Sequence, residues 1–111
     1  MAYDETLAER IGEILHAERG ERVTARRMFG GIAFMVHGNM CCGVVGADLM
    51  ARLGEDAGDA ALDEPHTRPM DFSGRPMKGY VYVAPAGTSA EDALRDWVTR
   101  ALAFVETLPP K

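Results

Sequence analysis

The sequence predicts a single α+β domain over residues 1–111, with an antiparallel sheet of about five strands flanked by N- and C-terminal helices. Apolar residues recur at helical spacing near both ends of the chain, and in the middle they alternate with a period of two. A length of 111 residues is typical of one domain with one main core. Helices at the ends and strands between them favour a layer of helices packed on a sheet.

The N-terminal segment 4–19 is predicted to form an amphipathic helix. Its apolar positions are Leu7, Ile11, Ile14 and Leu15. Asp4 is placed to cap the first turn, and Gly20 is a plausible stop at the other end. One stripe of this helix should therefore face the core.

Residues 23–53 are predicted to form strands, including a hairpin around Gly38 and Asn39 as a two-residue turn. That register pairs Val36 with Cys41, Phe34 with Gly43 and Ile32 with Val45. Both faces of this hairpin are then largely apolar, so we expect helices to cover one face and a partner to cover the other. Residues 49–53 read as a further strand.

The second half begins with an acidic segment, 54–64, that reads as a short helix or a loop. Prolines and glycines crowd residues 65–79, which predicts an irregular, proline-rich loop, and residues 79–84 follow as a strand. Thr88-Ser89-Ala90-Glu91 offers a capping box for the C-terminal helix. The apolar stripe of that helix is Leu94, Trp97, Val98, Ala101, Leu102, Val105 and Leu108, and Pro109 ends it. We expect Trp97 to lie in the core.

Composition narrows the range of functions. The net charge of -5 argues against direct contact with nucleic acid, which basic surfaces favour. The acidic start lacks the features of a signal peptide and no apolar run is long enough to span a membrane, so we expect a cytoplasmic protein. Its two cysteines, Cys41 and Cys42, are adjacent and should be reduced thiols, because a bridge between neighbours in a strand is strained.

Two segments and one glycine carry a family resemblance. They are Arg27-Met28-Phe29-Gly30-Gly31, the hairpin glycine Gly38, and Arg75-Pro76-Met77-Lys78-Gly79-Tyr80-Val81-Tyr82-Val83. In this combination and at these separations, the sequence resembles the N-terminal domain of the TfoX/Sxy family of competence regulators. The resemblance implies an α+β domain with an antiparallel sheet, similar to the secretion-chaperone-like folds, and makes a homodimer plausible.

The resemblance implies a non-enzymatic regulatory or protein-interaction module and supplies no catalytic residues. The competence regulators carry a second, C-terminal domain that this sequence does not show, so we expect a short, stand-alone member. The hypothesis from sequence is a module that acts as a homodimer, through the central hairpin or the C-terminal helix, with no cofactor.

The alternative hypothesis is a small anionic-ligand-binding protein or an enzyme. It rests on a set of basic and titratable residues before the glycine pair and in the proline-rich loop: Arg26, Arg27, His66, Arg68, Arg75 and Lys78. If the loop folds beside Arg26 and Arg27, these side chains form a patch that accepts a carboxylate, a phosphate or an acidic partner surface. The other interpretation is that the arginines are solvated and pair with Asp71 or with the acidic run Glu55, Asp56, Asp59, Asp63 and Glu64.

Two further patterns have structural interpretations. Met35, His37, Met40 and Cys42 share one face of the predicted hairpin, and all are soft-metal ligand types, but they lack the repeated spacing of a metal site. We therefore expect no metal. Gly30-Gly31 lacks the context of a phosphate-binding loop, and a tight turn explains it better.

Overall fold

The computed structural model describes residues 3–28, 30–72 and 75–110, which fold into a six-stranded antiparallel sheet with helices at both ends. The helices are α1 (Glu5–Arg19), α2 (Glu55–Ala61) and α3 (Glu91–Val105). The strands are β1 (Val23–Met28), β2 (Gly31–Val36), β3 (Asn39–Val45), β4 (Asp48–Arg52), β5 (Thr67–Phe72) and β6 (Arg75–Val83). The strand order β1-β2-β3-β4-β6-β5 makes β1 and β5 the two edges. The predicted α+β architecture is confirmed, with one strand more than the five expected.

Local signals place α1 as predicted. The Asp4 carboxylate accepts a hydrogen bond from the Leu7 N–H at 3.1 Å and so caps the helix. Gly20 ends it with a φ of 57°, a conformation that glycine adopts more easily than other residues.

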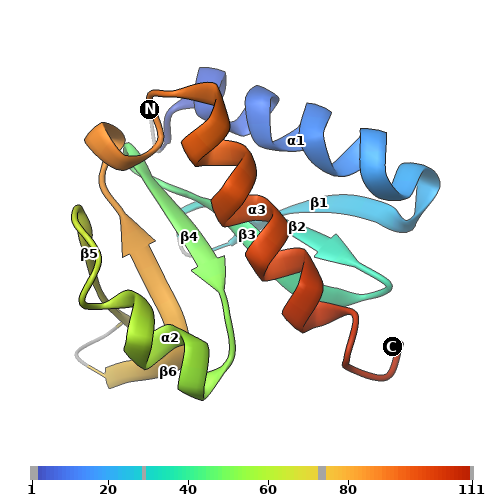
Figure 1. Cartoon of the computed structure of the whole chain (residues 1–111). Coiled ribbons are helices and arrows are strands. Elements are labelled where there is room, and N and C mark those ends of the chain that lie inside the picture. The colour runs from blue at the N-terminus through green and yellow to red at the C-terminus, as the bar shows by residue number, and fades with distance from the viewer. Residues whose placement is uncertain (1–2, 29, 73–74, 111) are drawn as a thin grey trace.

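One face of the sheet is covered by α1 and α3, which cross it side by side (Figure 1). Buried residues of both helices form one core with Phe34, Val44 and Leu49 from the strands. Trp97 is only 5% exposed within this core, as predicted. The aromatic and aliphatic side chains of these helices therefore fix the helix layer on the sheet.

The opposite face of the sheet carries a second core that we call the methionine face. It is formed by the buried residues Ala33, Met35, Met50, Met70 and Tyr82, with Met28, Met40, Val45, Met77 and Tyr80 partly buried around them. All ten residues belong to strands, so the helices contribute nothing to it. It holds six of the chain's seven methionines; the seventh, Met1, lies outside the described residues.

The central hairpin turns one residue earlier than predicted. Its turn residues are His37 and Gly38, with φ of 54° and 82°, and a type I′ turn needs positive φ at both positions. Val36 therefore pairs with Asn39, and an irregularity between Phe34 and Met35 brings Phe34 opposite Cys42. The predicted register was wrong, because a histidine at positive φ was not anticipated.

The predicted proline-rich loop was also wrong: most of residues 65–79 belong to the β5–β6 hairpin. Pro69 lies in the edge strand β5, where a residue without an N–H is tolerated because one side of the strand has no neighbour. The pairing with β6 shifts between Pro69 and Asp71. Tertiary pairing thus overrides the local signals that favoured a loop.

The predicted capping box of the last helix does not form. Ala90 is the N-cap of α3 and makes no side-chain capping bond. The Thr88 hydroxyl instead donates to the Pro85 carbonyl at 3.3 Å, within the short 3-10 turn Pro85–Gly87. The Thr88 hydroxyl, which the sequence predicted as the helix cap, is therefore bonded to the preceding turn instead.

Close backbone contact between β2 and β3 requires glycine at two positions. A Cβ added at Gly31 would lie 1.9 Å from the Val44 carbonyl oxygen, and one added at Gly43 would lie 2.2 Å from the Ile32 carbonyl oxygen. Gly30, with a φ of 74°, lies in the turn before β2. The structural interpretation of the glycine pair is therefore confirmed.

The substitution Gly31→Ala should destabilise the domain by about 3 kcal/mol or more, because the added methyl overlaps a backbone oxygen. Gly12→Ala is the matched control, since its Cβ would make an ordinary 3.6 Å contact with the Phe34 ring. We expect this helical position to gain about 0.5–1 kcal/mol. Urea denaturation of both variants measures the difference, and equal stabilities would contradict this account of Gly31.

A bidentate ion pair joins the segment after α2 to α3. The Arg100 guanidinium donates to both Glu64 carboxylate oxygens, at 2.8 and 3.0 Å, and lies 4.3 Å from the centre of the Trp97 ring. Hydrogen bonding to Arg100 lowers the pKa of Glu64. The pair therefore stabilises the fold only while Glu64 is ionised.

The stabilisation by Glu64 should be present above the ordinary glutamate pKa of about 4.3 and should be lost as the pH falls through the lowered folded pKa. We expect Glu64→Gln to cost under about 1 kcal/mol at neutral pH, because the pair is partly exposed. The cost should shrink progressively as the pH falls below the ordinary glutamate pKa. Urea denaturation at neutral pH and at a series of lower pH values checks this, with Glu13→Gln on the exposed face of α1 as the control.

Candidate functional site

The predicted basic patch is divided between the two edges of the sheet. Arg26 and Arg27 lie in β1, whereas Arg68 lies in β5, at the opposite end of the strand order. The patch required the segment after residue 65 to fold beside Arg26 and Arg27, and that condition is not met. The six residues therefore do not form one anion site.

The two adjacent arginines of β1 also lie on different faces of the sheet. Arg27 pairs with Ile32, which packs on the helix side, and Arg26 pairs with Ala33 of the methionine face. Cross-strand partners share a face, so the two side chains diverge. Both are exposed.

The basic residues near β5 have local structural roles. Arg68 donates to the Asp48 carboxylate at 2.6 Å and lies 4.6 Å from the centre of the Tyr82 ring. Hydrogen bonding to Asp48 raises the pKa of Arg68. His66 is exposed in a turn with a φ of 69°, and its carbonyl accepts from the Ala84 N–H at 2.8 Å. Arg68 is therefore paired with an acid, but with Asp48 and not with Asp71 or the acidic run that the second interpretation named.

The second family segment, residues 75–83, forms the whole of β6. The backbones of Arg75 and Pro76 pair with those of Phe72 and Asp71. Gly79 has a φ of 86°, and its carbonyl accepts from the N–H groups of Leu53 and Gly54 at the start of α2.

A side chain at Gly79 would meet the backbone there at 3.1 Å, so this glycine allows α2 to approach β6. Lys78 is exposed and lines a shallow hollow beside this contact. The second family segment is therefore explained largely by packing.

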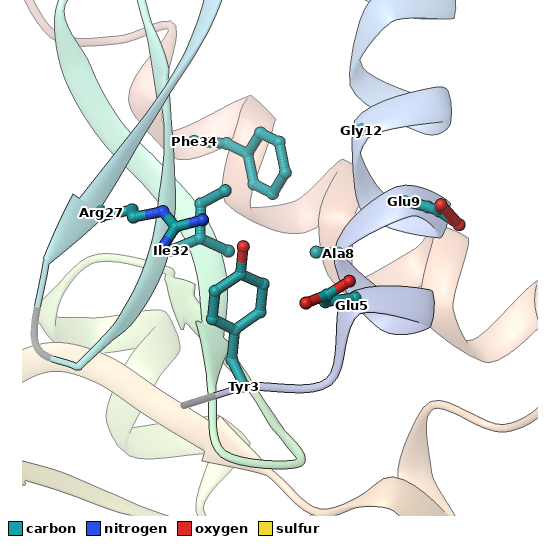
Figure 2. Close-up of a pocket in the computed structure, with 8 residues that line it drawn as sticks. All are labelled: Tyr3, Glu5, Ala8, Glu9, Gly12, Arg27, Ile32 and Phe34. Atoms are coloured by element: carbon teal, nitrogen blue, oxygen red, sulfur yellow. The ribbon is translucent and has the colours of Figure 1, made fainter. Parts of the chain in front are cut away.

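The first family segment lies beside a cleft between α1 and the β1–β2 hairpin. The cleft has a volume of about 370 Å³ and is lined by Tyr3, Glu5, Ala8, Glu9, Gly12, Arg27, Ile32 and Phe34 (Figure 2). A second hollow of about 290 Å³ lies next to it and is lined by Tyr3, Arg27, Met28, Gly30 and Gly31. Tyr3 and Arg27 line both spaces, so the motif residues form the border of one continuous surface; Phe29 lies outside the described residues.

The cleft has an apolar floor and charged walls. Ile32 and Phe34 form the floor, and the Arg27 guanidinium extends over it near the Tyr3 hydroxyl (Figure 2). On the other wall, the Glu5 carboxylate faces the cleft and that of Glu9 turns away. No salt bridge joins Arg27 to an acid within the described ranges, so its charge is free to meet a partner.

Residues on only one wall of this cleft were predicted from the sequence. Arg27 and the glycine pair were singled out, but Tyr3, Glu5 and Gly12 were not. Their place depends on how α1 packs over β1 and β2. Nothing in the local sequence indicates which face of α1 borders the edge strand.

The soft-ligand residues of the hairpin do not share a face. Met35 and Met40 belong to the methionine face, whereas Cys42 is buried in the helix-side core and His37 lies in the turn. The predicted grouping was wrong because the register differs. Both cysteines are free and buried. A hydrogen bond with Cys41, together with burial, raises the pKa of the Cys42 thiol well above its ordinary value.

Over the described ranges, no helix combines the length and the apolar character needed to cross a bilayer. The sequence pattern of the TfoX N-terminal domain matches residues 15–105, which is most of the chain. The comparison with curated proteins gave no match.

Proposed function

The chain belongs to the TfoX N-terminal domain family, and we propose that it is a non-enzymatic regulatory module that works by binding other proteins and by forming a homodimer. The family supports the regulatory or interaction role in general terms. The reduced, buried thiols of Cys41 and Cys42 are in keeping with a cytoplasmic setting.

The observation that carries the dimer is the methionine face. The apolar stripe of α3 is buried and one face of the central hairpin lies in the helix-side core, whereas the other face of the hairpin forms part of the methionine face. On the methionine face, partly exposed apolar side chains surround the buried ones; α2 borders this face at Met70, Met77 and Tyr80, and neither α1 nor α3 contributes a residue to it. Methionine adapts readily to an opposing surface. The Arg68–Asp48 pair gives this face both signs of charge, as a self-complementary interface requires.

Native mass spectrometry at micromolar concentrations should show a dimer. Val45→Lys should shift the population to monomer, because it places a charge on the partly exposed rim of the methionine face, where partner side chains would bury it. Ala103→Lys, at an exposed position of α3, is the control and should leave the dimer intact. A wild-type protein that stays monomeric at high micromolar concentration would refute the dimer.

Binding of a small anionic ligand is the second candidate function, and the cleft beside Arg27 favours it. Among the residues that the structure describes, Arg27 forms no salt bridge, and the floor is apolar. Citrate or inorganic phosphate should then raise the melting temperature, and Arg27→Gln should abolish the shift. Arg95→Gln, an exposed arginine of α3, serves as the control. If neither anion changes the melting temperature, this candidate is excluded for these two ligand types.

A further inference from the structure

The two edges of the sheet are protected to different degrees. In β5, Pro69 and the pairing shift that follows it interrupt the strand, and both features discourage pairing with another chain. In β1, six residues pair with β2 without interruption and none is proline. The side chains from Thr24 to Arg27 are all exposed. β1 is therefore the edge that is open to a further strand.

The backbone groups of β1 that point outward can be assigned from one hydrogen bond. The His37 N–H donates to the Arg22 carbonyl at 3.2 Å, next to the first pair of the β1–β2 ladder. Bonded and non-bonded pairs alternate in an antiparallel ladder. Counting along the register, Thr24 faces β2, while the N–H and C=O groups of Ala25 and Arg27 point away from the sheet. No residue in the described part of the chain hydrogen-bonds to these outward groups.

Charge favours one kind of strand at this edge. β1 contains Arg26 and Arg27 and no acidic residue, although the chain as a whole has a net charge of -5. Pairing of β1 with a second copy of itself would bring four arginines together, which is unfavourable. An acidic strand would instead meet opposite charge at Arg26, whereas on the helix side Arg27 shares the cleft with the Glu5 carboxylate, so acidic side chains gain less there.

The cleft adds a side-chain preference. Alternate residues of an added strand would point to opposite faces of the sheet. On the helix side they would lie beside the cleft, where Ile32 and Phe34 form an apolar floor. On the other side they would lie beside Arg26, which pairs with Ala33 of the methionine face. Apolar and acidic residues in alternation therefore match both sides.

We propose that the outer edge of β1 binds an extended acidic segment of another protein as a seventh strand of the sheet. The backbone of Ala25 and Arg27 pairs with the segment, Arg26 meets its acidic side chains, and the cleft takes an apolar one. This mode gives affinity through main-chain hydrogen bonds and specificity through the side chains. The backbone site runs along the edge of the sheet, with Arg26 bordering the methionine face, and a monomeric protein would still be able to use it.

The test is an NMR titration of the ¹⁵N-labelled chain with a capped hexapeptide that alternates glutamate and valine. We expect the amide signals of Ala25 and Arg27 to shift and their hydrogen exchange to slow, because both groups gain acceptors. Added salt should weaken binding. A peptide with lysine in place of glutamate should bind at least about tenfold more weakly, or about 1.4 kcal/mol.

Two kinds of variant test separately how charge and backbone pairing contribute to peptide binding. Arg26→Glu should weaken binding about tenfold or more, whereas Arg95→Glu makes the same charge change on exposed α3 and should not. Ala25→Pro removes one outward N–H and should also weaken binding. If Ala25→Pro does not fold, the comparison of Arg26→Glu with Arg95→Glu still tests the proposal. The proposal is overturned if the β1 amides do not respond at about 1 mM peptide, if the shifts map to the methionine face, or if both peptides bind equally.

Discussion

The register between β2 and β3 determines which side chains meet the helices and which form the methionine face. Two glycines fix it, because the strands approach so closely at Gly31 and Gly43 that no side chain fits. A slip of one residue would move Phe34 to the face that holds Met35, and each face would lose its partner surface. Every other strand pairs outward from this central hairpin, so its register sets the faces of the whole sheet.

Elements that depend on local signals could be predicted from the sequence, and those that depend on distant contacts could not. The helix α1 follows from Asp4, its apolar spacing and Gly20, all within one segment. The β5–β6 hairpin depends instead on β6 pairing with β4, which makes Pro69 tolerable at an edge. The central turn is an intermediate case: the hairpin was predicted, but the positive φ of His37 moved it by one residue.

The same division applies to the candidate site. Arg27 and the glycine pair could be identified because they stand together in the chain, while Tyr3 and Glu5 reach the cleft only through the packing of α1. Grouping Arg26 with Arg68 was wrong because the strand order places β1 and β5 at opposite edges of the sheet. The family motifs contain residues of both kinds. Close backbone contacts require glycine at Gly31 and Gly79, whereas the Arg27 side chain is exposed to solvent.

A sheet face built from methionine has a chemical consequence besides its packing. Oxidation converts a thioether into a polar sulfoxide, which packs poorly among apolar neighbours. Met28, Met40 and Met77 are partly exposed and would react before Met50 and Met70, which are only 1% exposed each. Oxidation by peroxide would therefore begin at the rim of the methionine face and reach its buried thioethers later.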